Sequence, residues 1–165
     1  GKDASMASAL VLADTIYHDL TLGGVVSWSG WLAVGPYDFK SGLVYVDKQE
    51  RTVEETKRLW VTAQFSRFIR PGSVRIGCDA EGERVRAVSF KPPGEGPLVC
   101  VLINPGTEPV PVGFGPGFAV VEAHTTDEDS DLEPVDPVSG GVLLGGRSVT
   151  TVRLTPAGRG GPAAP

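Results

Sequence analysis

The chain lacks the long hydrophobic runs that would cross a membrane. Its longest apolar stretches, such as residues 10–13 and 118–121, fall far short of the roughly 18 residues that a span requires. Positive charge is not concentrated either. The 15 Lys and Arg are outnumbered by 20 Asp and Glu, giving a net charge of −5, and no segment is basic enough to follow a phosphate backbone. We therefore expect no membrane span and no nucleic-acid partner.

Cysteine and histidine are scarce. Cys78 and Cys100 are too far apart for a metal-binding CxxC motif and too few to define a disulfide framework. They lie on strands that we expect to be near each other, so an oxidised pair and two buried, reduced thiols both remain open. His18 and His124 have no partner at catalytic or metal-ligand spacing. The sequence thus predicts no metal site, no cofactor and no catalytic histidine.

The amino terminus has neither an initiator Met nor the apolar region of a signal peptide. The chain opens GKDASM and continues directly into a helical pattern. From this we expect a processed product or a piece of a longer protein.

Glycine and proline are abundant in a chain of otherwise ordinary globular composition. The 22 Gly and 14 Pro are about 22% of the 165 residues, and 41% of the chain is hydrophobic. The usual share of Gly and Pro is roughly 12%, so the excess indicates many turns and short strands and disfavours a helical bundle.

The first 72 residues have an α/β pattern. Apolar side chains recur at helical spacing from about residue 4 to residue 20, after Asp3 or Ser5 as the cap. The run GVVSWSGWLAV at 24–34 is almost continuously hydrophobic, which is typical of a parallel strand buried on both faces. The run LVYVD at 43–47 predicts a short strand.

A second helix is expected to follow that strand. Thr52 and Glu55 have the T-x-x-E spacing of a capping box. The helix should continue to about Phe68 and end before Pro71 and Gly72.

The rest of the chain has short apolar or alternating runs separated by turn residues. The runs are SVRIGC, RVRAVSF, PLVCVLIN, VPVGF, FAVVEAH, GVLLG and SVTTVRL. They predict an antiparallel sandwich or barrel. The tail AGRGGPAAP is too poor in apolar residues to be ordered. We therefore divide the chain into an α/β part at 1–72, an all-β part at 73–155 and a disordered tail at 156–165.

Two long motifs carry a resemblance to a known family. They are SWSGWLAVGPYDFKSGLVYVD at 27–47 and TKRLWVTAQFSRFIRPGSVRIG at 56–77. They resemble the C-terminal part of family 30 glycoside hydrolases, and most of all the endo-β-1,6-galactanase branch, in which a Trp-rich strand leads to a PYDYKDGL-type loop and an RLW helix ends SRFIRPG. The more distant glucocerebrosidases share the W-x-x-W strand. The resemblance is strong over residues 4–103.

The resemblance implies a fold of two parts. Residues 24–34 would be the eighth strand of a TIM-type barrel, and residues 52–68 its last helix. Residues 73–155 would be the antiparallel β-sandwich side domain. The expected fold class is therefore α/β plus all-β, with the last β/α units of a barrel followed by a sandwich.

The resemblance also implies an activity whose chemistry lies elsewhere. Enzymes of this family hydrolyse glycosidic bonds with retention, using two glutamates on the fourth and seventh barrel strands. Both strands precede the region that this chain resembles, so Glu50, Glu54 and Glu55 inherit neither role. We expect a polysaccharide substrate, a missing N-terminal barrel part, secretion, and no catalysis by this chain alone.

The sugar-binding candidates lie on and after the eighth strand, because barrel active sites are at the carboxyl ends of the strands. Trp31 aligns with the tryptophan that lines the glycone subsite in relatives, and Trp28 should border the same pocket. Gly30 departs from the family, where another aromatic is common, and this leaves the exact substrate open. Without the resemblance, both tryptophans would more often be core residues.

The loop after that strand adds further candidates. Tyr37, Asp38 and Lys40 could contact the sugar or fix the loop. The acidic run DEDSD at 127–131 is a solvated hairpin loop in our interpretation, because Leu132 stands where a calcium loop needs glycine.

Two other functions remain open from the sequence. One is a non-catalytic carbohydrate-binding or accessory module in which Trp28 and Trp31 form a surface platform. The other is a structural sandwich that stabilises a neighbouring domain and binds no sugar.

Overall fold

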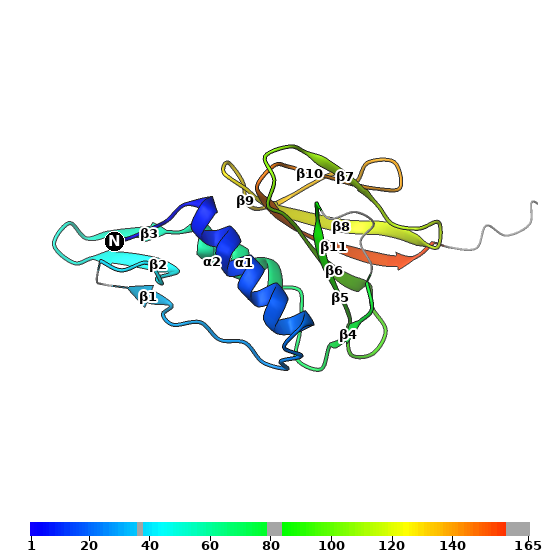
Figure 1. Cartoon of the computed structure of the whole chain (residues 1–165), viewed down its shortest axis with the longest axis horizontal. Coiled ribbons are helices and arrows are strands. Elements are labelled where there is room, and N and C mark those ends of the chain that lie inside the picture. Colours follow the sequence, from blue (N-terminus) through cyan, green and yellow to red (C-terminus); the bar gives the residue numbers. More distant parts are fainter. Residues whose placement is uncertain (36–37, 79–83, 158–165) are drawn as a thin grey trace, which may run out of the picture.

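The computed structural model describes residues 1–35, 38–78 and 84–157 (Figure 1). The first elements are α1 (Met6–Thr21), β1 (Val34–Gly35), β2 (Val44–Asp47), β3 (Thr52–Glu55) and α2 (Lys57–Ser66). The remaining strands are β4 (Val74–Ile76), β5 (Arg86–Lys91), β6 (Leu98–Asn104), β7 (Val110–Gly113), β8 (Phe118–Thr126), β9 (Asp131–Pro134), β10 (Gly141–Leu144) and β11 (Ser148–Pro156).

The strands after β3 form a sandwich of two antiparallel sheets. The larger sheet has the order β4-β5-β6-β11-β8-β9, and β7 pairs with β10 in a second sheet of two strands. In Figure 1 the two helices lie between this sandwich and the small β1-β2-β3 sheet. Each face of the larger sheet has its own hydrophobic cluster: one includes residues of both helices, and the other includes residues of β10.

Helix α1 confirms the sequence-based prediction. Ser5 has extended backbone angles and its hydroxyl accepts the Ser8 amide hydrogen at 3.3 Å, as an N-cap does. The buried face of α1 is made by Met6, Ala9, Leu12, Ala13 and Ile16. These side chains share a cluster with α2 and with strands β5, β6 and β11, so the apolar stripe packs the helix onto the sheet.

All of the predicted runs in the second half contain strands, but one strand was missed. Strand β9 reads DLEP and has neither alternation nor β-branched residues, so its sequence gives no strand signal. It is placed by pairing with β8, where Thr125 lies opposite Glu133. The loop between them holds the acidic run, and the Asp127 carboxylate accepts the amide hydrogens of Asp129 and Ser130. The predicted acidic hairpin loop is therefore confirmed.

The predicted helix start at Thr52 is wrong. Residues Thr52–Glu55 form β3, antiparallel to β2, and α2 begins only at Lys57 with Thr56 as its N-cap. The Asp47 carboxylate accepts the amide hydrogens of Glu50 and Gln49, which lowers the pKa of Asp47 and holds the turn between the strands. The capping-box spacing is a signal within four residues and would place a helix start at Thr52. Pairing of the same residues with β2 overrides it.

The predicted strand at 24–34 is also largely wrong. Only Val34 and Gly35 are in a ladder, parallel to β2, while residues 24–33 are outside any strand. The segment is not buried on both faces, because Val26 is fully exposed. A buried parallel strand needs a partner on each side to satisfy its backbone groups. Strand β2 reaches only the end of the segment, where the Val44 amide donates to the Ala33 backbone oxygen at 2.9 Å, and none of the described strands pairs with residues 24–31.

A buried polar network joins α2 to the larger sheet. The fully buried Gln64 side chain donates to the Thr126 hydroxyl at 3.0 Å and accepts the Thr151 amide hydrogen at 3.1 Å. The Thr151 hydroxyl donates to the Gln64 backbone oxygen at 2.7 Å. A single side chain therefore satisfies polar groups on two adjacent strands, β8 and β11.

Replacing Gln64 by leucine is expected to lower the free energy of unfolding by about 2 to 3 kcal/mol. The substitution leaves the buried Thr151 amide without its acceptor, and the apolar side chain cannot compensate. Urea denaturation followed by circular dichroism measures the change. Thr62→Ala on the same helix is the control, because the Thr62 hydroxyl only donates to Arg58 within α2. Equal midpoints for the two variants would contradict the prediction.

Candidate functional site

Trp31 lies on the surface of the molecule. Its side chain is 81% exposed and belongs to the extended segment just before β1. Val26 and Val34 on the same segment are also exposed, so large apolar side chains of this segment face solvent at several points. An exposed indole offers a flat apolar face that can cover the C–H face of a pyranose ring.

Trp28 has a different environment. Its indole N–H donates to the Asp19 carboxylate at 2.9 Å, and its ring packs against the cluster shared by the helices and the sheet. Gly30 lies beneath this ring, since a Cβ there would come within 3.1 Å of it. The structure therefore does not bring the two tryptophans into one exposed platform. Sequence reasoning missed Asp19, because a partner on the preceding helix leaves no local signal.

The loop candidates are only partly described. Tyr37 lies outside the described residues. Asp38 is exposed, and its carboxylate accepts the Lys2 backbone N–H at 2.7 Å. This contact ties the loop to the amino terminus, as the loop-fixing interpretation expects. Lys40 is also exposed.

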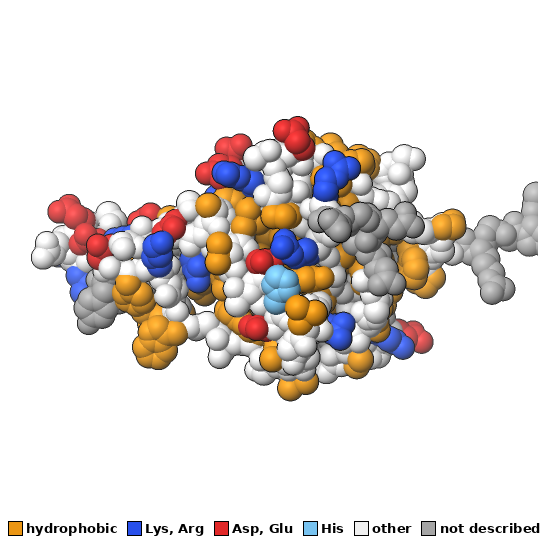
Figure 2. All heavy atoms as spheres, viewed as in Figure 1, with side chains coloured by type: hydrophobic (Ala, Val, Ile, Leu, Met, Phe, Trp, Pro, Cys, Tyr) orange, Lys and Arg blue, Asp and Glu red, His pale blue; other side chains and the backbone are white. Residues whose placement is uncertain are grey.

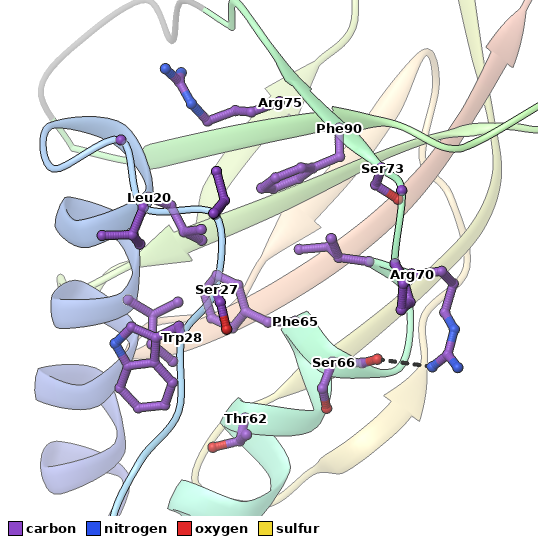
Figure 3. A pocket seen from close by; sticks show the side chains of 17 residues that line it. Leu20, Ser27, Trp28, Thr62, Phe65, Ser66, Arg70, Ser73, Arg75 and Phe90 are labelled. Carbon is purple, nitrogen blue, oxygen red and sulfur yellow. Dashed lines mark hydrogen bonds between the residues drawn. The ribbon is translucent and has the colours of Figure 1, made fainter.

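A cavity of about 730 Å³ lies at the other end of the extended segment (Figure 3). It is bounded by α1, residues 24–28, the end of α2 and the start of the larger sheet. Figure 3 shows Phe65 and Phe90 on its apolar side, and Arg70 donating to the Ser66 backbone oxygen at its polar side. Trp31 does not line it. Trp28 is the sequence-predicted site residue that lines it.

A smaller cavity of about 50 Å³ lies behind Trp31. Arg58 and Ser41 line it together with both tryptophans. The Arg58 guanidinium donates to the Ser8 backbone oxygen at 3.3 Å, which fixes it between α1 and α2. This arginine supplies positive charge near Trp31, and the sequence analysis had not singled it out.

The remaining polar candidates form no second centre. His18 lies 3.7 Å from Asp14, and His124 lies 3.6 Å from Glu122. Each carboxylate also pairs with an arginine of another element, Asp14 with Arg86 at 2.9 Å and Glu122 with Arg153 at 2.6 Å. Within the described ranges, no group of three or more metal-ligating side chains comes together. The face in Figure 2 shows basic and acidic side chains interspersed. None of the described helices is long and apolar enough to cross a membrane.

Comparison with known proteins agrees with this architecture. Residues 1–45 match the model of O-Glycosyl hydrolase family 30. The catalytic domain of a family 30 xylanase C from Talaromyces cellulolyticus is 26% identical, with a TM-score of 0.78 over 89% of this chain and 35% of that one.

Two bacterial structures also have a similar fold over most of this chain. A family 30 subfamily 8 xylanase from Clostridium acetobutylicum has a TM-score of 0.75 at 22% identity, over 92% of this chain and 40% of that one. A conserved exported protein from Bacteroides fragilis has a TM-score of 0.77 at 23% identity, over 88% of this chain and 33% of that one. This chain thus spans between a third and two fifths of the length of these structures.

These likenesses show the expected fold class. The chain combines α/β elements of the kind that end a TIM-type barrel with an antiparallel β-sandwich. The matching family model and the similar xylanase structures together support a relationship to glycoside hydrolase family 30.

Proposed function

We propose that this chain is the C-terminal portion of a secreted, retaining glycoside hydrolase of family 30 that acts on β-linked polysaccharide, and that it holds no catalytic glutamate. The observation that carries the proposal is the segment at 24–34. It lies within the region that matches the family model. Val26 and Trp31 are exposed outside any strand, and Val34 is exposed on β1, which pairs with β2 on one side only, so the segment has an uncovered apolar edge. Neighbouring barrel strands would bury that edge.

The substrate class is proposed from sequence resemblance. The PYDFKSGL loop and the SRFIRPG helix end resemble the β-1,6-galactanase branch. Two of the similar structures described above are xylanases, which makes xylan the natural comparison substrate. Trp31 is the proposed glycone-subsite residue, with the half-buried Trp28 bordering the same site and Asp38 and Tyr37 on the adjoining loop.

The positions of three glutamates before α2 support the proposed inactivity. Glu54 and Glu55 lie on the exposed strand β3, and Glu50 lies in the turn before it. Retaining hydrolysis needs two carboxyl groups about 5 to 5.5 Å apart across a sugar-binding cleft. These glutamates lie on a surface hairpin and not in such a cleft.

The test uses the natural polypeptide that contains SRFIRPG, purified from its source, beside the 165-residue chain. Its intact mass is measured first, because a barrel of roughly 250 residues with a sandwich of roughly 100 is about twice this length. We expect the longer species to release oligosaccharides from β-1,6-galactan, with the β-configuration retained by NMR, and faster than from xylan. The chain alone should release none above a mock purification. Product from the chain alone would refute the proposed inactivity, and faster cleavage of xylan would refute the proposed substrate.

A non-catalytic carbohydrate-binding module is the second candidate, favoured by the outward position of Trp31. Solution behaviour distinguishes the two. A barrel portion with an uncovered apolar edge should self-associate through that edge, whereas an evolved module should be monodisperse. A natural species of only 17.3 kDa that binds sugar would support the module. A folded chain that binds none would support a structural role.

A further inference from the structure

The two cysteines come together from different strands. Cys78 follows β4 at the edge of the larger sheet, and Cys100 lies in β6, with β5 between them. Neither sulfur is in a disulfide, Cys100 is buried and Cys78 is exposed. The expectation of two buried thiols is thus right for Cys100 only. The two side chains are nevertheless close enough to interact, because both line the same cavity.

Both thiols line one cavity. It has a volume of about 720 Å³ and lies between the larger sheet and the β7–β10 sheet. Ala87, Leu102 and Val112 are among its apolar lining residues. The exposed Cys78 is therefore accessible to a dissolved reagent, while Cys100 is sheltered behind it.

The surroundings of Cys100 keep it protonated. The hydrogen bond with Cys78 raises the pKa of the Cys100 thiol well above its usual value, and burial raises it further, while a hydrogen bond with Ser89 opposes both. Arg84 is the one charged residue among the described residues that line the cavity. Because its pKa is raised, the Cys100 thiol forms a thiolate only at higher pH than a free cysteine does, and it remains beside Cys78.

We propose that Cys78 and Cys100 form a redox-sensitive pair that closes into an intramolecular disulfide when the protein meets a small-molecule disulfide. The Cys78 thiolate attacks the reagent, forms a mixed disulfide and releases one thiol. The Cys100 thiolate then attacks the Cys78 sulfur and releases the second thiol. Two protons and two electrons leave the protein, and the reagent is reduced to two thiols. The bond fastens the chain after β4 to the third strand of the larger sheet.

The experiment incubates the full chain with oxidised glutathione. We expect an intact mass about 2 Da lower, with both thiols lost to alkylation and dithiothreitol restoring them. Closing the loop between residues 78 and 100 should raise the melting temperature by roughly 6 to 12 °C. The second step should accelerate from pH 7 to 9, because burial keeps the pKa of the Cys100 thiol raised and its thiolate fraction grows with pH.

Single variants separate the two steps. Cys100→Ala, which keeps the buried site apolar, should stop at the mixed disulfide with glutathione on Cys78. Cys78→Ser should react at neither step, because Cys100 is buried. A folded chain that keeps both thiols reduced, or one that forms only disulfide-linked dimers through Cys78, would overturn the proposal. Repeating the thiol count on the natural polypeptide extends the test to the protein that carries this chain.

Discussion

Replacing Trp31 by alanine is expected to weaken binding of a β-1,6-linked galacto-oligosaccharide to the natural polypeptide by roughly 30-fold, or about 2 kcal/mol. The indole is 81% exposed, so its removal leaves no cavity in the described structure. The loss comes from the apolar face that would cover the sugar ring. Isothermal titration calorimetry measures the dissociation constant, and circular dichroism checks that the variant is folded.

Two further variants make this result specific. Trp31→Phe keeps a flat aromatic face and should recover most of the affinity. Phe118→Ala removes an exposed aromatic side chain from β8 in the sandwich and should leave binding unchanged. If Trp31→Ala binds the sugar as tightly as the parent, Trp31 is not in the glycone subsite. If the isolated 165-residue chain binds the sugar and Trp31→Ala removes that binding too, the result favours the binding-module candidate.

The second large effect is expected at Gly141, where alanine should destabilise the fold by about 3 kcal/mol. Gly141 begins β10 and is buried opposite Gly113 of β7. A Cβ on Gly141 would come within 1.9 Å of the Val112 carbonyl oxygen. That oxygen belongs to the backbone of the partner strand, so it can move away only if the small sheet shifts. Thermal denaturation should show a melting temperature lower by roughly 6 to 12 °C.

The opposite residue of the same pair provides a matched control. A Cβ on Gly113 would be 4.0 Å from its nearest neighbour, the Gly140 carbonyl oxygen, which is an ordinary contact. Gly113→Ala should therefore change stability by no more than about 0.5 kcal/mol. Similar melting temperatures for the two alanine variants would show that the small sheet tolerates a shift of β10.

The two tryptophans show how far the sequence predicts the candidate site. Their W-x-x-W spacing and the family resemblance selected both as sugar-binding residues. In the structure Trp28 donates to Asp19 and packs on the core, while Trp31 is exposed. The separation depends on helix α1, which precedes the motif and supplies the carboxylate. Residue spacing inside the motif carries no information about that contact.

The segment just before α2 shows a similar limit to predicting the fold from the sequence. Thr52 and Glu55 have capping-box spacing, yet Thr56 is the N-cap and residues Thr52–Glu55 pair with β2. A cap contributes about 1 kcal/mol, and a set of cross-strand pairs contributes comparably. Whether residues 52–55 begin a helix or form a strand therefore depends on whether the rest of the chain places β2 beside them.

The sequence by itself determined α1, most strands of the sandwich and the resemblance of this protein to a known family. Apolar spacing and Ser5 set α1, the short runs between turn residues set the sandwich strands, and two long motifs indicated the family. The tertiary structure alone decided that residues 24–31 lack strand partners, that Gln64 joins α2 to the sheet, and that Cys78 and Cys100 line one cavity. The physical reason is the range of the interactions. Helix capping and alternation act within a few residues, whereas strand pairing, buried polar contacts and thiol proximity depend on residues distant in sequence.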